Sequence, residues 1–500
     1  MVDPRGNFPK EIDLETLFAE SFSALPPDEV VEKVNPFRRA VNRVLIGMAL
    51  CTLTLNFCGL NYILPTVGMV LSLLGFRALR RENGCFTACF VLTLLRCVQF
   101  FPTIVLNAFP CRDDFIPERV TTSLAQVSFA AQLLGLFCLW LGLRAVQRKA
   151  NLPPKAGGVL ALLVWYAAMY VLALIEYPGL YLPLLLMVIF IVILCRIRKT
   201  AKALGEAGYT MHPAPVRVPD LWLAILLAAA LVLGCAAGYL FGAQHPMDWQ
   251  PLEEAETAKT AKTAEIKANL LALGFPETIL NDLAEEDLSA CAGALRVDVE
   301  SEVYRPTRLN EKASPDKRLR ITSIAVQIPG EKDTWIILHH FLWEKGPLFF
   351  GTDALQVWPP YQPKYAYWAK GSDVTGRLLY DRDGQTYTAP YYFLGEAIGT
   401  DTVFLSLGTT KTDIYAGFSL PREGENRRGY LTYTMFDTGG ALDIISYFNY
   451  THQHTWFQYP ATTALQAQMN ARASNFLGPF ARVGTQFWFT PSSEHLQWPD

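Results

Sequence analysis

The segment CFTACFVLTLLRCVQFFPTIVLN (residues 85–107) carries one charged side chain, Arg96, among apolar residues. A helix needs roughly 17–25 mainly apolar residues to cross the hydrocarbon core of a bilayer, and this segment meets that need. An arginine at mid-bilayer costs about 2.5–3.5 kcal/mol on insertion scales, so Arg96 should face other helices and find a polar partner. The segment therefore predicts one helix of a membrane-embedded bundle.

Long apolar segments of the same kind flank it on both sides. The first, residues 44–76, is too long for one crossing and is interrupted by Asn56, Gly59, Asn61 and Pro65, which predicts a tight helical hairpin. The predicted membrane domain therefore covers residues 44–241 and contains about seven transmembrane helices. We expect these helices at residues 44–59, 62–77, 85–107, 121–143, 157–175, 180–195 and 221–241.

Lysine and arginine fall in alternate loops of this domain, which indicates its orientation. The basic residues before the first helix and after the second, fourth and sixth include Arg38, Arg39, Arg43, Arg77, Arg80, Arg81, Arg144, Arg148, Lys149, Arg196, Arg198, Lys199 and Lys202. With the opening hairpin counted as two crossings, this pattern predicts a plasma-membrane protein. Its tail (residues 1–43) would be cytoplasmic and its C-terminal half extracytoplasmic.

Several uncharged polar residues in these helices could pair with Arg96. The candidates are Asn56, Gln99, Gln126 and Gln132. Such a group would mark a substrate or ion pathway, or it would be a structural hydrogen-bond anchor between helices.

The last predicted helix carries Gly234, Gly238 and Gly242 at four-residue spacing. A ridge without side chains permits close helix approach. We expect it to serve packing within the bundle, with homodimerisation through this helix as the alternative.

Residues 242–296 are expected to form a helical stalk and a small helical unit. The stalk, LEEAETAKTAKTAEIKA (252–268), is rich in Ala, Glu, Lys and Thr. Beyond it, a first helix should end at Gly274, a second begin at Pro276 and a third near Ala284. The LGFP turn resembles the ubiquitin-associated type of three-helix unit. We expect this unit to pack on the domain that follows.

Residues 297–500 show short runs of β-branched and aromatic residues separated by turn signals, which predicts a mainly-β domain of sandwich or jelly-roll type. Residues 318–328 and 333–343 should pair as a hairpin, and Asp383–Gly384 should form the turn of another. Further strands are expected at 401–408, 413–420, 429–437, 443–457 and 481–490, with a helix at 461–477.

Aromatic residues of this domain are candidates for a ligand-binding platform. The run WPPYQPKYAYW holds Trp358, Tyr361, Tyr365, Tyr367 and Trp368, and its prolines favour an exposed, stiff loop. Trp335 and Trp343 belong to the same candidate set. A surface of this kind would suit cell-wall glycan, a peptide or an envelope protein, whereas most aromatic residues of such a domain serve its core.

No catalytic, nucleotide-binding or metal motif is present, and we expect no cofactor. His452 and His454 lie two apart on a predicted strand and so share a face, but the sequence offers no third metal ligand. His339 and His340 should point to opposite faces. The net charge of −3 argues against a nucleic-acid partner.

The overall architecture is similar to uncharacterised multipass envelope proteins of Gram-positive anaerobic bacteria. From the residues we expect a non-enzymatic membrane protein whose external β domain binds a ligand or partner, while the lipid bilayer surrounds its helices. Two alternatives are a transporter or transporter accessory subunit, indicated by Arg96, and an envelope enzyme whose residues converge only in three dimensions.

Overall fold

The computed structural model divides the chain into two compact units, which are described separately below. The first holds residues 1–104 and 116–232, and the second holds residues 105–115 and 233–500. The structure describes residues 36–53, 59–112, 116–175, 181–211, 216–252, 261–305, 318–347, 349–362, 367–401, 409–439, 443–455, 458–470 and 478–491.

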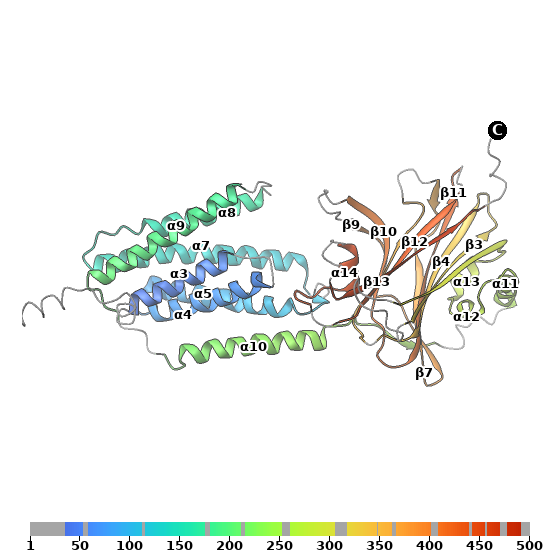
Figure 1. Cartoon of the computed structure of the whole chain (residues 1–500), viewed down its shortest axis with the longest axis horizontal. Coiled ribbons are helices and arrows are strands. Elements are labelled where there is room, and N and C mark those ends of the chain that lie inside the picture. The colour runs from blue at the N-terminus through green and yellow to red at the C-terminus, as the bar shows by residue number, and fades with distance from the viewer. Residues whose placement is uncertain are drawn as a thin grey trace, which may run out of the picture. The chain divides into compact units, whose positions relative to one another are not determined.

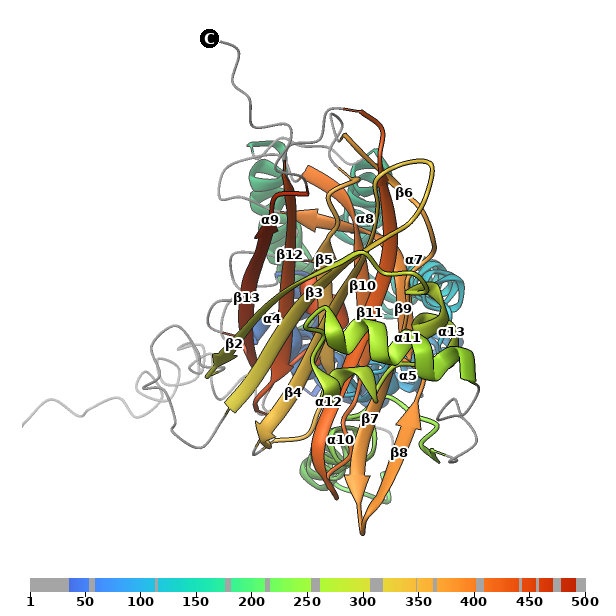
Figure 2. The ribbon, with the colours of Figure 1, turned by 90° about the vertical axis from the view of Figure 1, so that its right-hand side faces the viewer.

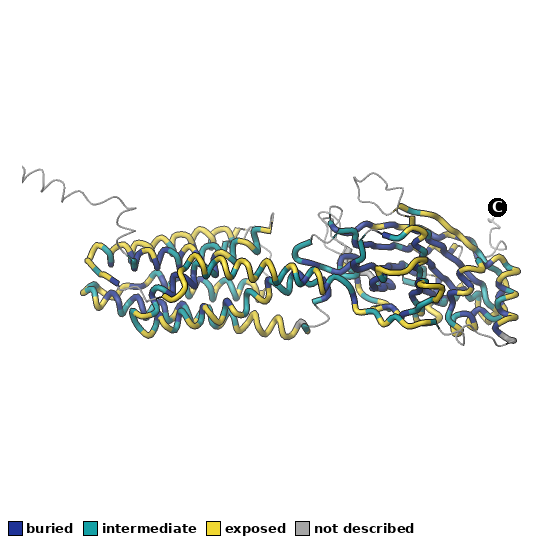
Figure 3. Tube along the Cα trace, turned by 90° about the horizontal axis from the view of Figure 1, so that it is seen from below, coloured by how far each residue is buried: buried dark blue, intermediate teal, exposed yellow. Residues whose placement is uncertain are grey.

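The N-terminal half of the chain is helical. Its helices are α3 (Pro36–Thr52), α4 (Leu60–Leu79), α5 (Gly84–Leu106), α7 (Glu118–Lys149), α8 (Gly157–Leu174), α9 (Tyr181–Glu206) and α10 (Asp220–Phe241) (Figure 1). In the described part of the chain, six of them, all but α3, are long and apolar enough to cross a membrane. Their outward surfaces expose large apolar side chains such as Val98, Val127 and Val232, which suits contact with lipid (Figure 3).

The first helix differs from the expected one. It has 17 residues, begins at Pro36 instead of residue 44, and contains Arg38, Arg39 and Arg43 inside the helix. Proline is favoured in the first turn of a helix. The buried side chains that follow it, including Phe37 and Val41, extend the apolar stripe toward the N-terminus. Asn56 lies outside the described residues.

Glycines bring α3 and α4 into close antiparallel contact. A Cβ atom on Gly68 would lie 2.6 Å from the carbonyl oxygen of Gly47, and one on Gly75 would lie 2.8 Å from that of Ala40. Side chains at these positions would force the helices apart, since real Cβ atoms do not approach backbone so closely. The opening hairpin that the sequence predicts is therefore present, as a pair of closely packed helices.

The C-terminal half is mainly antiparallel β-structure. Its strands are β1 (Gln250–Pro251), β2 (Arg296–Tyr304), β3 (Arg318–Ile328), β4 (Thr334–Lys345), β5 (Asp353–Trp358), β6 (Trp368–Lys370), β7 (Thr375–Arg382), β8 (Gln385–Ala389), β9 (Phe393–Asp401), β10 (Thr409–Phe418), β11 (Glu425–Asp437), β12 (Ile444–Gln453) and β13 (Phe480–Phe489). The first sheet has the order β1-β8-β7-β11-β4-β3-β2, with β6 also paired to β11, and the second has the order β13-β12-β5-β10-β9.

Most of the predicted strands are confirmed. β3 covers the predicted residues 318–328, and β7 and β8 form the predicted hairpin. Its turn residues Asp383 and Gly384 both have positive φ, 52° and 77°, as a two-residue hairpin turn requires. The strand expected at 401–408 falls almost wholly outside the described residues. The described part of the expected late helix is α14 (Ala464–Met469).

One hydrophobic core lies between the two sheets. Phe341 of the first sheet stacks against Phe418 of the second at 5.4 Å between ring centroids, and it meets Tyr450 at 5.0 Å. Trp335 and Trp343 are buried in this core, so neither belongs to a surface platform. The alternation of buried and exposed residues in the first half of β12 and along much of β13 follows from this packing on one face.

A small helical unit covers the outer face of the first sheet. Its helices are α11 (Ala261–Ala272), α12 (Glu277–Leu280) and α13 (Glu285–Ala290), and they lie across β3, β4 and β11 (Figure 2). They stand where the sequence places them, with Gly274 at φ 94° after α11, Pro276 preceding α12 and Ala284 preceding α13.

A buried carboxylate fixes this unit to the sheet. Asp282 accepts hydrogen bonds from His340 Nε2 at 3.1 Å and from Arg428 Nε at 2.8 Å. Burial alone would raise the pKa of Asp282, but the hydrogen bond and charge of His340, together with Arg428, hold that pKa below its usual value.

His339 points to the opposite face, into the core between the sheets, as the alternation along the strand predicts. Its ring nitrogens lie 2.8 Å from Ser323 Oγ and 3.0 Å from Ser446 Oγ. Burial lowers the pKa of His339 to about 3, because the interior disfavours the charged imidazolium. The histidine is therefore neutral wherever the β unit is folded near neutral pH.

This burial predicts a loss of stability in mild acid. Below the ordinary pKa of 6.5 the unfolded chain takes up a proton that folded His339, with its pKa of about 3, does not. The contribution of His339 to the stability of the folded β unit is fully present above pH 6.5 and declines as the pH falls toward 3. We expect the unfolding midpoint of the β unit, followed by tryptophan fluorescence in the full chain, to fall between pH 7 and 4.5.

His339→Gln should flatten this pH dependence, because glutamine keeps hydrogen-bonding groups in the core and does not titrate. The matched control is His454→Gln, at a half-buried position beyond β12, which should leave the slope unchanged. Equal slopes in the wild type and His339→Gln would contradict the assignment.

Candidate functional site: a cavity around Arg96

The face that α7 turns into the bundle includes a row of small residues. Ala125, Ser128, Ala131 and Gly135 recur at helical spacing, and a Cβ atom on Gly135 would meet nothing within 4 Å. Small side chains on one helix face leave space that the neighbouring helices do not fill. The result is a cavity of about 620 Å³, a size within the usual range for small-ligand sites.

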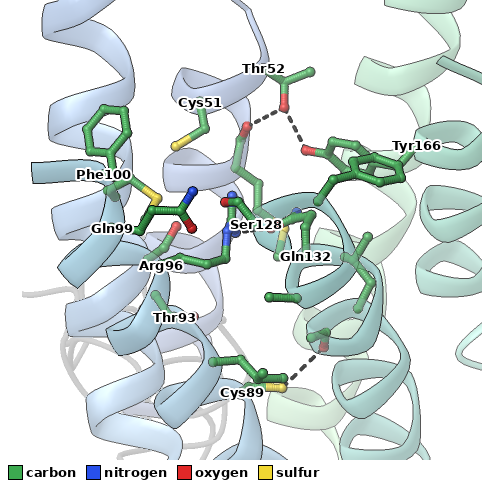
Figure 4. A pocket seen from close by; sticks show the side chains of 18 of the residues that line it. Cys51, Thr52, Cys89, Thr93, Arg96, Gln99, Phe100, Ser128, Gln132 and Tyr166 are labelled. Atoms are coloured by element: carbon green, nitrogen blue, oxygen red, sulfur yellow. Dashed lines mark hydrogen bonds between the residues drawn. The ribbon is translucent and has the colours of Figure 1, made fainter. Parts of the chain in front are cut away.

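Five helices contribute to the wall of this cavity: α3, α4, α5, α7 and α8. Its polar lining consists of Thr52, Ser72, Thr93, Arg96, Gln99, Thr103, Ser128, Gln132 and Tyr166. Most of the remaining lining is apolar or aromatic, and includes Met48, Met69, Phe76, Leu92, Phe100, Phe129, Leu136, Trp165 and Met169. Figure 4 shows Arg96, Gln99, Ser128 and Gln132 grouped within the cavity.

Arg96 lies near the middle of α5, about 18 Å along the axis from the first residue of that helix. Its Nη1 donates a hydrogen bond to Oε1 of Gln132 on α7. Its Nε atom is buried and has no hydrogen-bond partner among the described residues. One edge of the guanidinium is thus satisfied by the protein, and the other retains a donor.

Two further hydrogen bonds hold the polar wall in place. Gln99 Nε2 donates to the carbonyl oxygen of Leu124 at 2.6 Å, which ties α5 to α7. The hydroxyls of Thr52 and Tyr166 lie 2.7 Å apart and join α3 to α8 (Figure 4). These contacts link four helices around the same space.

Arg96 has no counter-charge in the apolar parts of the helices. Residues 44–76, 85–107, 121–143, 157–175, 180–195 and 221–241 contain one charged residue in total, Arg96, and no carboxylate. Gln132 supplies a dipole but leaves the net charge in place. An arginine at this depth costs about 2.5–3.5 kcal/mol on insertion scales, so an anion beside the guanidinium would lower the free energy of the site.

The predicted partners of Arg96 have different positions. Gln132 pairs with it and Gln99 lines the same cavity, whereas Gln126 is exposed on another face of α7. Asn56 lies outside the described residues. Nothing in the sequence marks the cavity itself, because small residues such as those of α7 are also typical of an ordinary packing face between helices.

The glycine ridge of α10 receives side chains from the end of α5 and from the residues that follow it. A Cβ atom on Gly234 would lie 2.8 Å from Val105, and those on Gly238 and Gly242 would lie 2.8 Å and 2.6 Å from the ring of Phe109. The ridge therefore makes an intramolecular contact, the use expected first. A homodimer through the last helix stays a prediction, and it would need another face of α10.

The aromatic run WPPYQPKYAYW does not form one platform. Trp368 is buried and its Nε1 donates to the carbonyl oxygen of Asp443, while Tyr361 packs on Tyr433 and donates to Glu396. Tyr367 is exposed. Tyr365 lies outside the described residues. A role of these residues in binding stays a prediction.

Trp358 instead belongs to an apolar row on the outer face of the second sheet. Tyr447 is its partner on β12, with ring centroids 5.1 Å apart. Two residues along β12, Ile445 pairs with Trp488 of β13. Tyr447, Ile445 and Trp488 are 37%, 39% and 59% exposed, so an aromatic surface lies open there. Long-range strand pairing assembles it, which explains why the sequence did not reveal it.

The two candidate metal-binding histidines are separated by the end of β12. His452 is buried and its Nδ1 lies 2.7 Å from Asp353 Oδ1, whereas His454 follows the strand. In the part of the chain that the structure describes, no group of three or more His, Cys, Asp or Glu side chains could hold a metal ion.

Comparisons with known proteins assign the chain to no family. No family model matches the chain, and no curated protein matches it. A solved structure described as "Pore forming protein" is 7% identical over 39% of this chain and 92% of that chain, with a TM-score of 0.18. The NetB toxin of Clostridium perfringens in its membrane-inserted form is 8% identical over 39% and 97%, with a TM-score of 0.13. Scores this low carry no argument about fold or activity.

Proposed function

We propose that the chain is a multipass plasma-membrane protein with seven crossings, a cytoplasmic N-terminus and an extracytoplasmic β unit. The antiparallel contact of α3 with α4 supports α3 as the first crossing, since two helices packed along their length span the same depth. Charged groups at one end of the bundle support the orientation. Asp220 at the start of α10 lies 2.6 Å from Arg43 Nη1 and 3.5 Å from Arg77 Nη1.

Within this membrane protein, the helix bundle binds a small ligand in the cavity around Arg96, as a carrier or a membrane receptor. The observation that carries this proposal is a cavity of about 620 Å³ that holds a guanidinium with an unsatisfied nitrogen. A purely structural arginine would have its donors used by neighbouring helices. A site with few convergent polar groups in an apolar wall is typical of small-molecule binding.

A second candidate function concerns the β unit, for which we propose glycan binding at the outer face of the second sheet. Trp358, Tyr447 and Trp488 offer ring faces, and the exposed Gln486 on the same face offers an amide group. Flat apolar rings beside neutral hydrogen-bonding groups complement an uncharged sugar chain.

The proposed topology predicts a specific labelling pattern. In a cysteine-depleted variant with single reporters at Lys33, Lys149 and Gln385, an impermeant thiol reagent on intact cells should label 385 alone. Labelling at both 33 and 385 would mean that α3 does not cross. Protection at 385 with labelling at 33 and 149 would mean that the orientation is inverted.

Filling the cavity should displace what it binds. Gly135→Phe introduces a ring where a Cβ atom meets nothing within 4 Å, so the helices can keep their packing. We expect a small molecule that co-purifies with the wild type, detected by mass spectrometry of extracts from the purified protein, to be lost from this variant.

The matched control is Gly157→Phe, at an exposed glycine that also has open space and does not line the cavity. It should retain the molecule. Identical extracts from all three proteins would argue against a ligand in the cavity.

The glycan proposal predicts that the aromatic row, and not the neighbouring loop, carries binding. Tyr447→Ala and Trp488→Ala should each weaken binding of the full chain to a polysaccharide array by about 2- to 10-fold, because each removes one stacking face. Tyr367→Ala, which removes an exposed ring elsewhere in the β unit, should have no effect. An equal loss of polysaccharide binding in all three variants would contradict the assignment of the binding site to this face.

A further inference from the structure

The charge of the cavity indicates the class of its ligand. Arg96 carries a full positive charge, and among the residues that the structure describes, those that line the cavity include no aspartate or glutamate. The side chains nearest to it in the wall, Gln132, Gln99 and Ser128, are neutral and able to donate hydrogen bonds. A cation would meet repulsion here, whereas an anion would meet one charge and several donors.

The apolar residues of the lining indicate the nature of the rest of the ligand. Cys89 Sγ donates to the carbonyl oxygen of Gly135, and Arg96 donates to Gln132, so α5 and α7 run antiparallel along the cavity. One turn from Arg96 toward the start of α5, Leu92 on α5 and Leu136 on α7 form an apolar part of the wall, beside the hydroxyl of Thr93. Phe76 adds a ring from α4. An apolar chain would be dehydrated in this part of the cavity.

We infer that the cavity binds an amphiphile with one acidic head group, a carboxylate or a phosphate monoester or diester, and an apolar tail. This inference rests on the proposed function, because it names the ligand of the same site. The acidic oxygens accept hydrogen bonds from Arg96, and the tail lies along Leu92 and Leu136. The single cation in the wall offsets one negative charge of the head group.

The test uses the full chain in a non-ionic maltoside micelle and a set of matched probes. Dodecanoate, dodecyl phosphate and phosphatidylglycerol carry an acidic head, dodecanol is neutral, dodecyltrimethylammonium is cationic, and acetate and inorganic phosphate have no tail. Binding is read from the concentration at which each probe raises the thermal unfolding midpoint. We expect the acidic amphiphiles to bind, and the neutral, cationic and tail-free probes to bind at least about 10-fold more weakly.

Two substitutions separate charge from folding. Arg96→Gln should weaken binding of the acidic amphiphiles by about 10- to 100-fold, the usual contribution of a hydrogen-bonded charge, and leave dodecanol unchanged. Arg96→Lys should keep much of the affinity, because it keeps the charge. Arg39→Gln, at an exposed arginine on α3, should bind as the wild type does.

Each other outcome overturns a different statement. Equal binding of dodecanol and dodecanoate, insensitive to Arg96→Gln, would overturn the acidic head group while the cavity remains a ligand site. Binding of acetate or phosphate as tight as that of their dodecyl counterparts would overturn the tail and identify a small-anion site. Binding of phosphatidylglycerol alone would identify the membrane lipid as the source, and binding of dodecanoate alone a free acid. If no probe raises the unfolding midpoint, and extracts of Gly135→Phe and of the wild type contain the same molecules, the proposed function is overturned as well.

Discussion

A single uncompensated cation in an apolar bundle is the constraint on which the helical unit depends. Arg96 sits halfway along a helix of membrane-spanning length, and the surrounding apolar segments hold no carboxylate. Such a charge is tolerated only where other helices enclose it and offer dipoles. Gln132 does so from α7, and the small residues of the same helix leave a space in front of the guanidinium. The cavity is therefore a consequence of one face of α7, and its positive charge comes from Arg96 on α5.

The close hairpin of α3 and α4 contributes to the same arrangement. Gly47, Gly68 and Gly75 let the two helices approach until backbone meets backbone, which leaves no free space between them. Space remains instead where Ala125, Ser128 and Gly135 face α5. The bundle thus combines one tightly packed pair of helices with one loosely filled interior. The β unit is packed differently. Its two sheets bury aromatic rings in one core and leave an aromatic row on an outer face.

Much of the fold was predictable from sequence because it depends on local patterns. Apolar segments of bilayer length marked the helices, alternation marked β3, and Asp383–Gly384 marked a turn that requires positive φ. The need of a buried arginine for a partner placed Gln132 among the candidates, and Arg96 donates a hydrogen bond to it. The start of α3 was misplaced because Arg38 and Arg39 look like a helix boundary, although the helix continues through them to Pro36.

The remainder depends on contacts between residues far apart in the chain. Trp368 is buried because β6 pairs with β11, and Trp358 gains Tyr447 as a neighbour because β5 pairs with β12. The cavity needs five helices to define it. The most direct measurement is an electron cryo-microscopy map of the full chain in lipid nanodiscs. We expect elongated density that begins at the Arg96 guanidinium and extends toward Leu92 and Leu136. A collapsed interior, with Arg96 enclosed by protein groups on every side, would contradict it.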